Sequence, residues 1–156
     1  MGEGFGSEGR RQVGQEAPEM RRAVLLDTSG WVAAAVRGQA RHEEAKAAYI
    51  SAIREGYRII VTPMVLGESH ALFVRLLGRL RAAAAMESVL GDPAHVVFAV
   101  DQALTKAAVD RWILAYRDQD FSLCDAVSFE VMQREGITRA LSIDRHFVTA
   151  GYEVVG

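Results

Sequence analysis

The chain has 156 residues, of which 50% are hydrophobic and 24% are charged, as is typical of one globular domain with its own core. Its formal net charge of -2 excludes tight binding of duplex nucleic acid through a strong overall positive field. The single cysteine, Cys124, excludes an internal disulfide, and no apolar run reaches the ~18 residues of a membrane span.

Residues 1–22 differ in composition from the rest of the chain. They are rich in glycine and charge and nearly free of branched apolar side chains. Such a segment buries too little surface to offset the entropy lost on ordering. We therefore expect a flexible tail over residues 1–22 and one folded domain over residues 23–156. The lone cysteine and the absence of a signal-peptide pattern lead us to expect a cytoplasmic protein.

The folded part alternates short apolar runs with capped helical segments. In chain order we expect a strand at 23–27, helices at 28–36 and 42–55, a strand at 57–61, helices at 63–78 and 80–90, a strand at 95–100, helices at 102–116 and 123–135, and strands at 139–143 and 152–155 around a helical turn. Short apolar strands that alternate with helices predict an α/β fold. Its sheet is expected to be mainly parallel, with four or five short strands flanked by helices.

Acidic residues occur where this sheet should present the carboxyl ends of its strands. Asp27 closes the first strand, and Asp144 directly follows the fourth. Asp125 lies in the first turn of an apolar helix, and Glu68 lies in the second turn of the helix after the second strand. Because parallel strands end at one edge of a sheet, we expect these four carboxylates to gather there.

A gathering of carboxylates needs a compensating charge. Two carboxylates ~4 Å apart repel by ~4 kcal/mol at an effective dielectric constant near 20. Mg²⁺ and Mn²⁺ prefer carboxylate oxygens and water as ligands, whereas no pair of histidines or cysteines has the spacing of a zinc site. The pattern therefore predicts a magnesium-type acidic site.

Each acid also has a purely structural interpretation. Asp27 and Asp144 can cap helices, and Ser122 with Asp125 has the spacing of a capping box. Glu68 is too deep in its helix to cap it, but it can be a surface acid at the edge of the core. Capping therefore stays open for the individual residues, and only the joint pattern favours a metal site.

Four stretches in this order resemble the PIN-domain ribonucleases, especially the VapC-type toxins of bacterial toxin–antitoxin pairs. The stretches are LLDTSGWVA, TPMVLGESHALFVR, FSLCDAVSFEVMQREGITRAL and SIDRHFVTAGYE. The resemblance runs from residue 23 to the end of the chain and implies a PIN-like fold. Carried over residue by residue, the acidic site of the family falls on Asp27, Glu68, Asp125 and Asp144, with Thr28 and Ser142 as supporting hydroxyls.

The resemblance also implies an activity and partners. It implies hydrolysis of RNA phosphodiester bonds with one or two Mg²⁺ or Mn²⁺ ions, leaving 5′ phosphate and 3′ hydroxyl ends. The expected partners are an RNA substrate, a small antitoxin protein and a second copy of the chain in a homodimer, with no membrane. Candidate RNA contacts are Arg75 and Arg79, which share a helical flank with Glu68 if the helix passes Gly78, and Arg145 and His146.

Other functions remain open at this point. A PIN-like nuclease of RNA processing needs no antitoxin, and a non-catalytic binding module would use the same acids only as helix caps. Other phosphoryl-transfer folds fit less well. A haloacid-dehalogenase-like protein needs an acid two residues after Asp27, where Ser29 stands, and a receiver-like protein needs a late lysine, whereas the lysines are Lys46 and Lys106.

Overall fold

The computed structural model describes residues 22–155. The tail expected over residues 1–22 lies almost wholly outside this range. Within residues 22–155, no helix combines the length and the apolar character needed to cross a bilayer.

A five-stranded sheet forms the centre of the fold, in the order β3-β2-β1-β4-β5. The middle strand β1 (Ala23–Leu26) pairs with β2 (Arg58–Val61) on one side and with β4 (Arg139–Leu141) on the other. The edges are β3 (His95–Val97) and β5 (Glu153–Val155). All four pairings are parallel, which confirms the predicted α/β fold.

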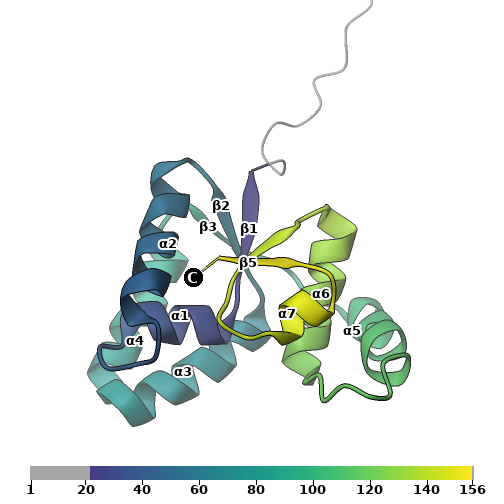
Figure 1. Ribbon diagram of the computed structural model, residues 1–156. Helices are drawn as coiled ribbons and strands as arrows, with labels where there is room; N and C mark the ends of the chain where they lie inside the picture. The colour runs from purple at the N-terminus through teal and green to yellow at the C-terminus, as the bar shows by residue number, and fades with distance from the viewer. Residues whose placement is uncertain (1–21, 156) are drawn as a thin grey trace, which may run out of the picture.

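Helices cover both faces of this sheet (Figure 1). One face carries α1 (Thr28–Ala35), α2 (His42–Arg54), α3 (Pro63–Leu77) and α4 (Arg79–Gly91). The other face carries α5 (Gln102–Ala108), a π-helical segment (Val109–Leu114), α6 (Leu123–Glu135) and α7 (His146–Thr149). Each face of the sheet has its own hydrophobic core. Along β1, Val24 and Leu26 pack into the core on the side of α1 to α4, whereas Ala23 and Leu25 pack into the core on the side of α5 to α7. Coverage on both faces explains why the strands are continuously apolar in sequence.

Some boundaries differ from those expected. The strand expected over 95–100 ends at Val97, because its neighbour β2 ends at Val61, where Thr62 caps α3. The helix expected over 102–116 changes to a π-helix after Ala108. The wider π turn holds Trp112 in the core, where its Nε1–H donates to Glu130 at 3.2 Å.

Candidate active site

The end of β1 and the end of β4 meet at the carboxyl edge of the sheet. The backbone N–H of Asp27 donates to the Leu141 carbonyl at 3.1 Å, which fixes the two chain ends against each other. Helix α1 starts there with an unusually close approach to β4. A β-carbon added at Gly30 would lie 2.1 Å from the Leu141 oxygen, so only glycine fits at this crossing.

Two serine hydroxyls hold the Asp27 carboxylate. Oδ2 of Asp27 accepts the Ser29 hydroxyl at 2.6 Å, the Ser142 hydroxyl at 2.9 Å and the Ser29 backbone N–H at 3.3 Å. The serine oxygens are fixed in turn, because Ser29 Oγ accepts the N–H of Ile143 at 3.1 Å and Ser142 Oγ accepts that of Asp144 at 3.0 Å. The network thereby connects the end of β1 with the loop that carries Asp144.

The hydroxyls of this network are only partly those expected from the sequence. Ser142 lies against Asp27, whereas the buried Thr28 hydroxyl makes no hydrogen bond to that carboxylate. Ser29 takes the place expected for Thr28. Asp27 caps α1, and the residue two positions after a cap offers its N–H to the capping side chain, so its hydroxyl is also close. That spacing is the sequence signal by which Ser29 could have been found.

Burial makes the charge on Asp27 costly. The side chain is 4% exposed, and burial raises its pKa from 3.8 to about 6, with a smaller contribution in the same direction from the charge of Asp125. The hydroxyls of Ser29 and Ser142 and the Ser29 backbone amide oppose this rise in pKa. A cation bound at this carboxylate would therefore favour its ionised form and remove part of the cost.

The second half of the site lies on α6 and α7. Asp125 forms a capping box with Ser122, in which each side chain accepts the backbone N–H of the other residue, at 3.1 and 3.0 Å. Asp125 Oδ2 also lies 3.2 Å from Nδ1 of His146, and the same nitrogen lies 3.5 Å from Asp144 Oδ2. The backbone N–H of His146 donates to Asp144 Oδ1 at 2.9 Å. Capping and clustering thus coexist in Asp125.

The fourth acid, Glu68, lies on α3. It is exposed in the second turn of that helix, on the side of the buried thiol of Cys124. Burial is the main cause that raises the pKa of Cys124 to about 12, and the charges of Glu68, Asp27 and Asp125 contribute to this rise in that order. The thiol thus lies within electrostatic reach of carboxylates from three segments of the chain. Among the described residues, Asp125, Asp144 and His146 bring donor atoms within 4.8 Å of one another. Asp27 is connected to Asp144 through Ser142, and Glu68 lies outside this group, exposed on α3.

The basic candidates are less concentrated. Arg75 lies in the last turn of α3, but Arg79 begins α4, because Gly78 between them has a φ of 85° and ends the first helix. The two arginines therefore do not share one helical flank, because the condition for it, a helix that continues past Gly78, is not met. Arg145 is exposed at the start of α7, beside Asp144.

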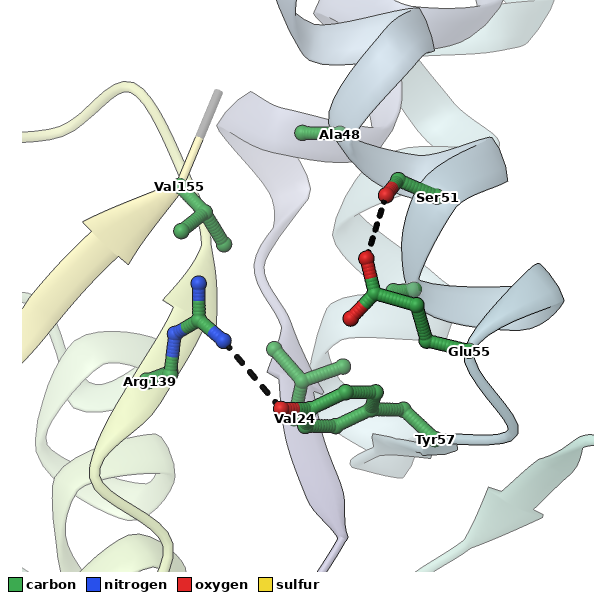
Figure 2. Close-up of a pocket in the computed structure, with 8 residues that line it drawn as sticks. Val24, Ala48, Ser51, Glu55, Tyr57, Arg139 and Val155 are labelled. Atoms are coloured by element: carbon green, nitrogen blue, oxygen red, sulfur yellow. Dashed lines mark hydrogen bonds between the residues drawn. The ribbon is translucent and has the colours of Figure 1, made fainter.

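A separate cavity of about 110 Å³ lies between α2 and the sheet, near the starts of β1 and β4 (Figure 2). Its polar groups pair with one another. Arg139 Nη1 donates to the Tyr57 hydroxyl at 3.3 Å, and Ser51 donates to Glu55 at 2.8 Å. None of the four acids lines this cavity, so it is not part of the carboxylate site.

The PIN domain family model matches residues 24–151, a span that contains all four acids. The chain belongs to the PIN domain family. Over 129 residues it is 33% identical to the 23S rRNA-specific endonuclease VapC20 of Mycobacterium tuberculosis, in strains CDC 1551 / Oshkosh and H37Rv, which covers 83% of this chain and 95% of the relative. This PIN-domain protein is a homologue of the VapC ribonuclease toxins, which confirms the family predicted from the sequence.

The fold of a solved relative agrees with this assignment. The crystal structure of Mycobacterium tuberculosis VapC20, described as a sarcin–ricin loop cleaving toxin, superposes on the PIN-domain protein with a TM-score of 0.77 at 32% identity. The match covers 86% of this chain and the whole of that chain. The PIN-like architecture predicted from four short stretches of sequence is thereby confirmed.

Proposed function

We propose that this PIN-domain protein is a ribonuclease toxin that cleaves large-subunit ribosomal RNA, using a divalent ion held by its clustered carboxylates. The observation that carries the proposal is the continuous set of contacts from Asp27 through Ser142 and Asp144 to His146 and Asp125. The substrate follows from the likeness to VapC20, whose name describes an enzyme acting on 23S rRNA. The proposed metal ligands are Asp27, Glu68, Asp125 and Asp144.

The residues present fit Mg²⁺ or Mn²⁺. Both are hard ions that prefer carboxylate oxygens, and the buried carboxylate of Asp27 has a raised pKa that a cation would lower. Metal ions in such nucleases activate water and stabilise the charge on the leaving oxygen. The carboxylates at this edge therefore suit the divalent ions that the proposed nuclease would use.

The protein residues supply position and charge around that ion. The serine hydroxyls and the Ser29 amide bind one oxygen of Asp27 and so fix its orientation. Asp125 projects from α6, whose residues 124–132 are all buried, so the packing of the helix holds that carboxylate in place. A metal site tolerates only small displacements of its ligands, which is a reason to place a carboxylate on a buried helix. Arg145, exposed beside Asp144, is a suitable contact for an RNA phosphate.

The partners belong to the same proposal. A VapC-type toxin is expected to pair with a small antitoxin, and the chain is expected to form a homodimer. Exposed apolar side chains on α3 and α4 support a protein interface there: Val74, Leu76, Leu80 and Leu90. Sedimentation of the wild type and of Leu80→Glu tests the dimer, because a charge at this strongly exposed position should yield a monomer without affecting the fold.

Cleavage of RNA by metal-stripped protein tests the activity. We expect the wild type to cut 23S rRNA, and an oligonucleotide with the sarcin–ricin sequence, only after Mn²⁺ or Mg²⁺ is added. Asp144→Asn should remove the cleavage, whereas Asp118→Asn, the same change at an exposed acid, should leave it unchanged. Cleavage that persists in EDTA or in Asp144→Asn would refute the metal-dependent nuclease, and cleavage confined to other RNA would refute the ribosomal substrate.

A binding module whose acids only cap helices remains the competing function. The capping bonds of Asp27 and Asp125 are what favours it. It predicts that Mn²⁺ does not stabilise the protein, whereas a metal site predicts a melting temperature that rises with ion concentration by mass action. A neighbouring antitoxin gene separates the toxin from a PIN nuclease of RNA processing.

A further inference from the structure

We propose that His146 is a nitrogen ligand of the bound ion and that it biases the site toward Mn²⁺ over Mg²⁺. The inference rests on the proposed metal site and adds to it a residue outside the four acids. His146 Nδ1 lies 3.2 Å from Asp125 Oδ2 and 3.5 Å from Asp144 Oδ2. One donor atom from each of these residues lies within 4.8 Å of the other two.

These separations are those of a hydrogen bond and an ion pair, and they are also close to those of donor atoms that share an ion. Ligands about 2.1 Å from an octahedral ion lie about 3 Å apart at neighbouring corners and about 4.2 Å apart at opposite corners. Both distances from Nδ1 are close to the value for neighbouring corners. An ion placed among Asp125, Asp144 and His146 therefore requires only small movements of the three side chains.

The local structure holds the imidazole in this position. His146 follows Asp144 by two residues, and its backbone N–H donates to the Asp144 carboxylate. This bond fixes the first turn of α7 against Asp144. The ring packs edge to face against Phe121, with 5.3 Å between ring centroids, and the next residue, Phe147, is fully buried. The side chain remains 30% exposed, which leaves access for an ion.

The chemistry of the donor gives the preference. Without an ion, Nδ1 of His146 carries the hydrogen that it donates to the neighbouring carboxylates. A bound ion would take the place of that hydrogen, because a neutral imidazole with its proton on Nε2 presents a lone pair at Nδ1. Mn²⁺ prefers oxygen ligands as Mg²⁺ does, but as a first-row transition ion it accepts an imidazole nitrogen more readily than Mg²⁺ does. Four carboxylates alone would discriminate weakly between Mg²⁺ and Mn²⁺, and one added nitrogen would favour Mn²⁺.

The test measures ion binding and not catalysis. The full chain is stripped with EDTA and titrated with Mn²⁺, and electron spin-echo envelope modulation of the bound ion is recorded to detect a coordinated nitrogen. The variants are His146→Ala, His146→Gln, which offers an oxygen in place of the nitrogen, and the control His70→Ala, which removes an exposed histidine of α3. Thermal melts in EDTA verify that each variant is folded.

We expect a nitrogen signal in the wild type and in His70→Ala, and none in either His146 variant. Replacing a residue that only hydrogen-bonds a metal ligand typically weakens metal binding by about tenfold or more. Loss of His146, a direct ligand, should weaken Mn²⁺ binding by at least this much. Mg²⁺ binding, measured by competition, should change much less, and less in His146→Gln than in His146→Ala.

Three results would overturn the inference. The first two leave the proposed nuclease function intact, and the third overturns that function as well. Mn²⁺ bound to the wild type without a nitrogen signal, or an unchanged ratio of Mn²⁺ to Mg²⁺ affinity in His146→Ala, would remove His146 from the shell and leave the proposed nuclease intact. A wild type that binds neither ion, and whose Asp144→Asn variant cleaves RNA normally, would overturn both this inference and the proposed function.

Discussion

Replacing Asp27 by asparagine is expected to stabilise the metal-free protein at neutral pH. Burial raises the pKa of Asp27 from 3.8 to about 6, and one pKa unit corresponds to about 1.4 kcal/mol. The ionised carboxylate therefore costs the native state up to about 3 kcal/mol. Asparagine keeps the shape and one acceptor oxygen for Ser29 and Ser142, but it removes the charge. At about 2 to 4 °C per kcal/mol, the melting temperature should rise by up to about 10 °C.

The pH dependence of this gain has a defined sign. Because the pKa is higher in the native state, the native protein keeps this proton at pH values where the unfolded chain has lost it. Below pH 3.8 both states carry the proton, and ionisation costs nothing. The cost grows as the pH rises from 3.8 to about 6 and is constant above that range. The advantage of Asp27→Asn should therefore be small near about pH 4 and complete by about pH 7.

Urea denaturation in EDTA at several pH values measures this difference between variant and wild type. Asp118→Asn provides the matched control, because it makes the same change at an exposed aspartate. Equal or lower stability of Asp27→Asn near about pH 7, or an advantage that persists near about pH 4, would refute the reasoning. Added Mn²⁺ should reverse the order, since the wild type gains stability by binding the ion and the variant binds it less well.

Three further predictions concern the packing around the site. Gly30→Ala places a β-carbon 2.1 Å from the Leu141 carbonyl oxygen, so we expect a loss of about 2 kcal/mol or more in thermal melts together with weaker Mn²⁺ binding; an unchanged melt would contradict the close approach. Glu130→Leu leaves the Trp112 N–H without its acceptor and removes the buried carboxylate that pairs with Arg111 and Arg134, which should cost about 1 to 3 kcal/mol in urea denaturation. Cys124, whose pKa burial raises to about 12, should resist thiol reagents in the native protein and react fully in denaturant, and rapid labelling of the native state would count against this.

Much of the fold could be predicted because its signals are local. The Thr62–Pro63 pair predicts the start of α3, where the Val65 N–H donates to the Thr62 hydroxyl at 3.2 Å. Gly136 predicts the end of α6 and lies there with a φ of 66°. The boundaries that differ depend on distant partners. Residues beyond Val97 do not continue the strand, because the neighbouring strand has ended, and no residue of β3 itself carries that information.

Some features of the site could likewise be predicted from the sequence, and others could not. The positions of Asp27 and Asp144 after strands are readable from the sequence, because any parallel sheet brings such ends together. The contact of Ser29 with Asp27 is also local, because the residue two positions after a helix cap lies beside the capping carboxylate. The direction of the His146 ring depends on Phe121, which lies far away in the chain. A contact between distant residues therefore decides the orientation of His146, which the sequence does not reveal.

The position of Asp27 makes the geometry of the site depend on both cores at once. Its strand β1 is the middle strand, with Leu26 packed into the core beneath α1 to α4 and Leu25 into the core beneath α5 to α7. The proposed ligands come from the same two sides, because Glu68 belongs to a helix of the first face and Asp125 to a helix of the second. Packing changes in either core would shift one set of donors against the other, and a metal site is sensitive to such shifts. We therefore attribute the rigidity of the proposed metal site to β1. This strand is packed on both faces, and its last residue, Leu26, directly precedes Asp27 and so fixes the position of that carboxylate.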